Sequence, residues 1–214
     1  MRSVRLFYKK IGNLKFISHL DINRFMIKMI RLSGVPVWYS EGFNPHPYIT
    51  FALPLSLGFE SNYEVMDVRL DDDNFKNEDV LNCLKSKMPK GIEFFAVANP
   101  VMKAGSIAFA DYEIVFDTVD NKVLEVFENF LSKDSIIAQK LTKKGKMKDI
   151  DLKEFVSSFN VANDKVLLRL SAGGSANLNP KLLLDTFEKE CGINLPPYSV
   201  TRTMLYNEKM ERFA

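Results

Sequence analysis

Residues 18–36 set the first half of the fold, and their sequence is Ser18-His-Leu-Asp-Ile-Asn-Arg-Phe-Met-Ile-Lys-Met-Ile-Arg-Leu-Ser-Gly-Val-Pro36. Its apolar residues recur at intervals of three and four, which predicts an amphipathic helix over residues 20–32. Ser18 and Asp21 have the spacing of a capping box, so the helix is expected to begin beside them. Gly34 is a natural helix end, and the proline two residues later stops the helix from continuing. The residues expected on its buried face are Phe25, Met29 and Leu32.

Shorter runs on both sides of this helix have the alternating pattern of β-strands. Before it, residues 4–9 predict a strand, and residues 12–13 predict a turn into an extended segment at 14–17. After it, we expect a strand that starts at 37–39 and resumes at 48–51 after a loop. Strands at 63–70 and 92–97 and a helix at 77–88 are expected to follow. The order of elements is therefore strand, helix, strand, strand, helix, strand.

The second half of the chain repeats this order of elements without repeating its residues. Asn179 and Pro180 mark a helix start, and Gly192 marks its end. The elements expected here are strands at 112–117, 136–141, 165–170 and 199–206 and helices at 121–131 and 179–192. This pattern predicts an α+β protein of two tandem ferredoxin-like (βαββαβ) units, each an antiparallel sheet with helices packed on one face. The expected boundary separates residues 1–103 from residues 104–214.

Composition points to a globular protein and limits its partners. Hydrophobic residues make up 46% of the chain and charged residues 26%, which is enough apolar surface for a packed core. The formal net charge is only +2, so nucleic-acid binding would require a local basic patch. Cys83 and Cys191 lack the spacing of metal ligands, and we expect reduced thiols. With no pattern of a signal peptide or membrane span, we expect a cytoplasmic protein without membrane contact, metal or cofactor.

The helix at residues 20–32 carries basic side chains on one face. Arg24, Lys28 and Arg31 are spaced by four and three, so they lie on the same side of the helix. Lys15 precedes the helix start, which can itself receive an anion. This pattern predicts a ridge that contacts phosphates; the alternative is a charged face that is only solvated.

Residues 42–47, Gly-Phe-Asn-Pro-His-Pro, form the second part of the candidate site. The two prolines restrict the backbone on both sides of His46, and a stiff loop loses less entropy on binding. The side chains expected to contact bases or a partner protein are Tyr39, Phe43, Asn44 and His46, and Tyr48 offers a further flat face. The alternative is that these rings pack against the adjacent helix. The residues expected to support the site are Ser18, Asp21, Gly42, Pro45 and Pro47.

Both histidines of the chain, His19 and His46, lie in this region. The imidazole of His19 can pack locally at the helix start, contact RNA or act as a general base. Metal binding is a further alternative, for which Asp21 and Glu41 are the carboxylates near in sequence. The sequence leaves these alternatives open.

The most basic stretch of the second half lies between residues 140 and 153. Lysines predominate there, and such a run is either a solvated loop or an electrostatic footprint for an acidic partner. The lysines expected to contact phosphates are Lys143, Lys144, Lys146 and Lys148.

Three segments together resemble the radical SAM-linked family of bacterial proteins. They are Leu14-Lys-Phe-Ile-Ser-His-Leu-Asp21, Tyr39-Ser-Glu-Gly-Phe-Asn-Pro-His-Pro47 and Ile49-Thr-Phe-Ala-Leu-Pro-Leu55. The resemblance extends across essentially the whole chain. It implies a protein that acts beside, or fused to, a radical SAM protein with a cobalamin-binding-type domain, in RNA or ribosome maturation. The chain lacks the cysteine trio of an iron–sulfur cluster, so it is not itself expected to be the radical enzyme.

The tandem architecture is also similar to that of CRISPR repeat-processing endoribonucleases. That similarity implies metal-independent RNA cleavage with His19 or His46 as the general acid–base, although Gly173-Gly-Ser is shorter than the glycine-rich loop of those enzymes. Three hypotheses therefore follow. The favoured one is an RNA-binding accessory that presents its substrate to a radical SAM partner. The alternatives are an endoribonuclease and a protein–protein adaptor that does not contact RNA. The sequence does not predict the oligomeric state.

Overall fold

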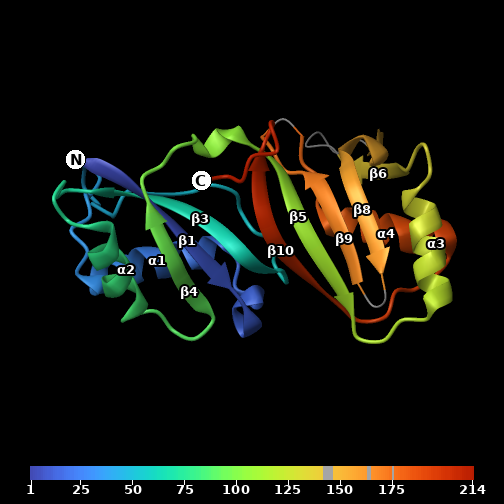
Figure 1. The fold of residues 1–214 in the computed structure, drawn as a ribbon, viewed down its shortest axis with the longest axis horizontal. Coiled ribbons are helices and arrows are strands. Elements are labelled where there is room, and N and C mark those ends of the chain that lie inside the picture. The colour runs from blue at the N-terminus through green and yellow to red at the C-terminus, as the bar shows by residue number, and fades with distance from the viewer. Residues whose placement is uncertain (142–146, 163–164, 175) are drawn as a thin grey trace. The chain divides into compact units, whose positions relative to one another are not determined.

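The computed structural model describes residues 1–141, 147–162, 165–174 and 176–214. These residues form two compact units (Figure 1). Unit 1 contains Met1–Ile107 together with Glu211–Ala214, and unit 2 contains Ala108–Met210. Each unit combines a sheet with two α-helices, so the predicted α+β class is confirmed. The division lies a few residues beyond the expected one, and the last four residues return to unit 1.

Unit 1 is built around a sheet with the strand order β4-β1-β3-β2, in which neighbouring strands are antiparallel. A one-residue step along a strand changes the face of the sheet, so this register decides which side chains share a face. In chain order its elements are β1 (Arg2–Lys10), α1 (His19–Ser33), β2 (Ile49–Phe51), β3 (Glu60–Leu70), α2 (Asn77–Lys85) and β4 (Ile92–Ala98).

Both helices of unit 1 pack against the same face of this sheet (Figure 1). The core between them includes Leu6 of β1, Met26 of α1 and Val80 of α2, each at most 1% exposed. Val4, Tyr8, Met66 and Val68 of the central strands extend the same core. The alternate residues of β1 and β3 therefore point to the opposite face, which we call the outer face of unit 1.

Helix α1 begins and ends where the sequence predicts. The side chain of Ser18 accepts a hydrogen bond from the main-chain N–H of Asp21, and Gly34 ends the helix with φ 79°. The predicted face is only partly right. Phe25 packs half-buried against the core, but Leu32 is 56% exposed, and the fully buried apolar positions are Ile22, Met26 and Ile30. Two overlapping apolar stripes run along this helix, and only packing against the sheet selects one of them.

The segment between β1 and α1 also differs from expectation. Residues predicted as an extended return at 14–17 fall mostly in a 3₁₀ helix, η1 (Gly12–Phe16). Gly12 has φ 65°, a conformation that glycine adopts without steric cost. The tight turn that this glycine permits continues into the 3₁₀ helix, whereas an alternating apolar pattern alone suggests a strand.

Unit 2 has the strand order β10-β5-β9-β8, and a separate two-stranded sheet pairs β6 with β7. Strand β9 lies antiparallel to both β5 and β8. In chain order the elements are β5 (Ile107–Phe116), α3 (Asn121–Leu131), β6 (Ile137–Leu141), β7 (Met147–Asp151), β8 (Val156–Ala162), β9 (Lys165–Ser171), α4 (Pro180–Cys191) and β10 (Tyr198–Asn207).

One predicted strand of unit 2 has a different role. Residues 136–141 were expected in the main sheet, but β6 pairs only with β7 among the described strands. The strand that pairs with β9 at the edge of the main sheet is β8, a strand that the sequence pattern does not predict. Strand β8 has no fully buried residue, and a bulge between Val156 and Ser158 interrupts its alternation, so its apolar pattern is weak. Within the described ranges, no helix combines the length and apolar character needed to cross a bilayer.

Candidate functional site

The segment between α1 and β2 is fastened to β3 by main-chain hydrogen bonds. The N–H of Trp38 donates to the carbonyl oxygen of Arg69 at 2.9 Å, and the N–H of Arg69 donates to that of Tyr48 at 3.2 Å. The N–H of Tyr48 in turn donates to the carbonyl oxygen of Trp38 at 3.1 Å. Residues 39–47 therefore form a loop that is closed at its base on β3.

Arg69 lies between two aromatic rings at this base. The carbon at the centre of its guanidinium group is 5.1 Å from the ring centroid of Trp38 and 4.8 Å from that of Tyr48. Both distances are within the range of cation–π attraction. Sequence reasoning missed Arg69 and Trp38. The available signals were a lone arginine between apolar strand residues and the only tryptophan of the chain.

The end of α1 is joined to the same loop through Arg31. Its Nη2 donates a hydrogen bond of 2.7 Å to the carbonyl oxygen of Pro45, and its guanidinium lies 5.6 Å from the ring centroid of Tyr39. The structure therefore brings together one basic residue of the predicted ridge and the predicted loop. We call Arg31, Trp38, Tyr39, Tyr48 and Arg69 the aromatic–arginine edge. Tyr39 and Tyr48 are 40% and 46% exposed, so both rings are accessible to a ligand.

His46 is held near the base of the loop, where its carbonyl oxygen accepts a hydrogen bond of 2.9 Å from the N–H of Ser40. Its Nδ1 is 3.1 Å from the carbonyl oxygen of Asn44 and 3.1 Å from the hydroxyl oxygen of Ser40. A carbonyl oxygen only accepts hydrogen bonds, so the contact with Asn44 places the hydrogen on Nδ1. The Nε2 of a neutral imidazole is then an acceptor on an exposed side chain.

His19 lies apart from these contacts at the start of α1. Its ring is half-buried and meets the ring of Phe51 edge-on, with 5.1 Å between centroids. Among the described residues the two imidazoles do not touch each other, and each has its own neighbours. Local packing, one of the alternatives for His19, is therefore what its described contacts show.

Some of the remaining basic residues of the predicted ridge are paired with carboxylates. Arg24 lies 3.5 Å from the carboxylate of Asp21, and Lys15 lies 3.6 Å from that of Glu60. Lys28 is exposed and, within the described ranges, has no carboxylate partner. Lys28 and Arg31 are consequently the ridge residues whose charge is best placed for a phosphate.

The tip of the loop exposes Phe43 completely, together with Asn44 and Pro45, while Pro47 is buried at its base. Gly42 has φ 122°, which a residue with a side chain rarely adopts, so this glycine is required for the turn. In unit 2, Lys148 is exposed on β7. The other predicted phosphate contacts, Lys143, Lys144 and Lys146, lie outside the described residues.

Among the described residues of unit 2, the walls of two cavities are formed by residues other than the predicted site residues. One of about 490 Å³ lies between the β6–β7 hairpin and α4, with Ile137, Met147 and Lys189 in its wall. The other, of about 290 Å³, lies on the main sheet beside Asp111 and Arg169. Across the described parts of the chain, no three metal-ligating side chains gather in one place.

Two solved structures share a low sequence identity with the chain. A chain of the Cbf5–Nop10–Gar1 crystal structure is 11% identical, with a TM-score of 0.47; the match covers 96% of this chain and 50% of that one. An unknown protein from Galdieria sulphuraria is 12% identical, with a TM-score of 0.28 and coverages of 94% and 98%.

No curated protein matches the chain. A family model does match residues 3–180, which is most of the sequence and includes the whole aromatic–arginine edge. The chain therefore belongs to the family described as an uncharacterized protein conserved in bacteria (DUF2344).

Proposed function

We propose that this protein binds RNA through the aromatic–arginine edge of unit 1. The observation that carries the proposal is the contact of two guanidinium groups with three aromatic rings around one loop. Single-stranded RNA is recognised by stacking of its bases on aromatic and guanidinium planes and by contacts of basic groups with its phosphates. Tyr39, Tyr48 and Phe43 offer exposed rings, and Lys28 and Arg31 offer cations nearby in the chain.

The fold agrees with such a role. Each unit has the element order strand, helix, strand, strand, helix, strand once the β6–β7 hairpin is set aside as an insertion. The sheet orders β4-β1-β3-β2 and β10-β5-β9-β8 place the fourth, first, third and second strands of each unit side by side. We interpret both units as ferredoxin-like on this basis. A fold alone does not define a function, so the proposal rests on the edge.

The partner of the proposed complex is a radical SAM protein, and the support for this is the sequence resemblance alone. An accessory that presents RNA should join its partner through the RNA, at least in part. We therefore expect nuclease treatment to weaken recovery of a radical SAM protein with this chain from a bacterial lysate. Recovery that resists nuclease would favour the adaptor hypothesis instead.

The binding itself is tested with a labelled single-stranded RNA of mixed sequence and a labelled hairpin RNA. Each phosphate neutralised on a single strand contributes about −0.7 to the slope of log affinity against log salt. With roughly three to four phosphate contacts, a fourfold rise in salt should weaken binding by about 20- to 50-fold. Fluorescence anisotropy over a salt series measures this slope. Binding that ignores salt, or no binding to either RNA, would contradict the proposal.

A further inference from the structure

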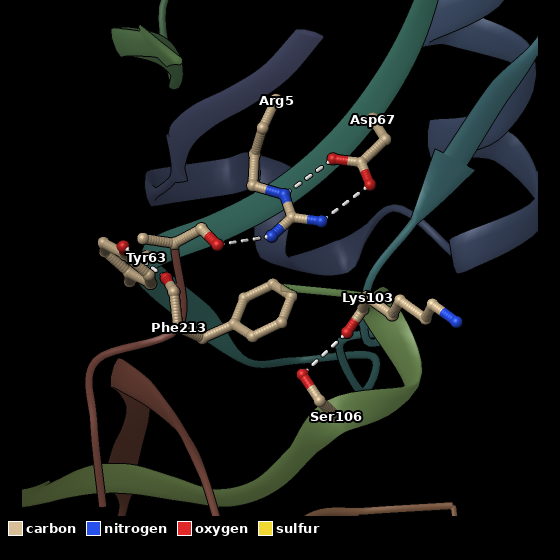
Figure 2. Close-up of polar contacts among 7 residues, drawn as sticks. Arg5, Tyr63, Asp67, Lys103, Ser106 and Phe213 are labelled. Atoms are coloured by element: carbon tan, nitrogen blue, oxygen red, sulfur yellow. Dashed lines mark hydrogen bonds and ion pairs between the residues drawn. The ribbon is translucent and has the colours of Figure 1, made fainter. Parts of the chain in front are cut away.

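The outer face of unit 1 contains a buried arginine. The side chain of Arg5, on β1, has no exposed surface and forms a two-pronged ion pair with Asp67, its register partner on β3. The Nε and Nη2 of Arg5 donate to the two carboxylate oxygens at 2.7 and 2.8 Å (Figure 2). This pairing leaves one nitrogen of the guanidinium group and its flat face for a further partner.

The remaining nitrogen and the flat face of the Arg5 guanidinium group both contact residues 213–214. Nη1 of Arg5 donates a hydrogen bond of 2.7 Å to the carbonyl oxygen of Ala214, and the guanidinium lies 4.4 Å from the ring centroid of Phe213. The ring of Phe213 is completely buried. In Figure 2 this ring lies between Arg5 and the turn that contains Lys103 and Ser106. The hydroxyl group of Ser106 fixes that turn by donating to the carbonyl oxygen of Lys103 at 2.8 Å.

The main chain of residues 211–214, which we call the tail, is also held by hydrogen bonds. The hydroxyl group of Tyr63 donates to the carbonyl oxygen of Phe213 at 2.8 Å, and the N–H of Met102 donates to that of Ala214 at 3.1 Å. The guanidinium of Arg212 lies over the ring of Tyr63, 4.7 Å from its centroid. Burial is the main cause that raises the pKa of Tyr63, so its hydroxyl group remains a donor at neutral pH. The recess thus holds one aromatic ring and two successive carbonyl groups.

Unit 2 contains the same arrangement with its residues exchanged. Asp111 of β5 and Arg169 of β9 are register partners and form a two-pronged ion pair of 2.6 and 2.8 Å. The guanidinium of Arg169 lies 4.4 Å from the ring centroid of Tyr206, whose hydroxyl group donates to Asp111 at 2.9 Å. Here the aromatic ring comes from β10, a strand of the same sheet.

Unit 1 differs from unit 2 in where its aromatic ring comes from. Its contiguous residues supply the ion pair, Tyr63 and the turn, whereas the ring over the guanidinium comes from a segment 150 residues after Tyr63. That segment is short, and it is held by side chains and main-chain groups that are already positioned by β1, β3 and the turn. A recess of this kind has the properties of a peptide-binding site with a resident occupant.

We propose that the recess formed by Arg5, Tyr63, Asp67 and the turn at Met102–Ser106 is a peptide-binding site, occupied in this structure by the chain's own residues 211–214. Its ligand is an extended peptide with a phenylalanine whose own carbonyl group and that of the next residue accept the two sets of hydrogen bonds. The site is separate from the aromatic–arginine edge and does not depend on RNA binding.

The test uses the full chain with the substitution Phe213→Ala, which removes the resident ring and leaves the recess residues intact. The probe is a fluorescent peptide of sequence Lys-Met-Glu-Arg-Phe-Ala, which corresponds to residues 209–214. The peptide should bind the Phe213→Ala protein and not the unaltered chain, in which the recess is filled. A peptide with alanine in place of phenylalanine should bind about 10- to 100-fold more weakly, because the buried ring supplies much of the contact. The substitution Tyr206→Ala, which removes the equivalent ring of unit 2, should not create a binding site.

Three outcomes would overturn the proposal, one from peptide binding, one from hydrogen exchange and one from the folding of the variant. The first is a folded Phe213→Ala protein, verified by circular dichroism, that does not bind the peptide. The second comes from hydrogen exchange in the unaltered chain. A displaceable occupant exposes the N–H groups of residues 211–214 through local opening, so they should exchange faster than those of β1 and β3. Exchange of both sets at one common rate, or a Phe213→Ala protein that cannot fold, would identify the tail as an inseparable part of the core.

Discussion

Replacement of Arg5 by alanine is expected to lower the free energy of unfolding of unit 1 by about 3 to 5 kcal/mol. The guanidinium group is fully buried, and its removal leaves the carboxylate of Asp67 without its partner. The carbonyl oxygen of Ala214 also loses a donor, and the ring of Phe213 loses the cation over its face. Trp38 is the only tryptophan of the chain and lies in unit 1, so its fluorescence during urea denaturation reports the unfolding of this unit.

Two further variants test whether the loss of stability in Arg5→Ala comes from the burial of the charge or only from the loss of a charge. Lys9 is on the same strand and faces Glu93 at 3.9 Å, but the two side chains are 42% and 54% exposed. Lys9→Ala should therefore cost less than about 1 kcal/mol. The double variant Arg5→Met with Asp67→Leu should recover much of the stability lost in Arg5→Ala, because neither charge is left unpaired. If Arg5→Ala lowered the free energy of unfolding no more than Lys9→Ala does, the buried ion pair would not stabilise unit 1 as argued.

Local chemistry explains which elements could be predicted from the sequence. The ends of α1 follow from Ser18 and Gly34, and the start of α4 follows from Asn179, whose side chain accepts a hydrogen bond from the N–H of Lys181. These signals act within one helical turn, so they can be recognised without knowledge of the rest of the fold. The loop at residues 42–47 likewise follows from its own prolines and glycine.

The features that could not be predicted depend on contacts between distant segments. Strand register places Arg5 opposite Asp67, and no pattern near either residue specifies the other. Arg69 belongs to the candidate site only because β3 lies beside the loop that carries Trp38 and Tyr48. The same limit applies to strand β6, whose apolar residues suit a strand of the main sheet or of a separate hairpin equally well. Pairing partners are decided by the assembled sheet, and they are not visible in the pattern of one strand.

The double substitution Tyr39→Ala with Tyr48→Ala is expected to weaken RNA binding by about 30-fold or more. Stacking of a base on an aromatic side chain contributes about 1 to 3 kcal/mol, and this variant removes two rings. Both rings are accessible, and the main-chain hydrogen bonds of Tyr48 do not depend on its side chain, so the fold should be retained. The matched control is Tyr39→Phe with Tyr48→Phe, which keeps both rings and should bind nearly as well as the unaltered protein. Fluorescence anisotropy with the labelled single-stranded RNA measures four affinities: those of the unaltered protein, the two double variants and Arg31→Ala.

The dependence on salt distinguishes stacking from phosphate contact within this series. Removal of the two rings changes no charge, so the slope of log affinity against log salt should stay at its original value. Arg31→Ala should reduce the magnitude of that slope by about 0.7 to 1, since one phosphate contact is lost. Lys87, an exposed lysine that follows α2, provides a control for charge alone, and Lys87→Ala should leave both affinity and slope unchanged. If the tyrosine and arginine variants all bind RNA as the unaltered protein does, the aromatic–arginine edge is not the RNA interface. If only the arginine variant is weakened, the edge contacts the RNA backbone, and its rings serve to hold the guanidinium groups in place.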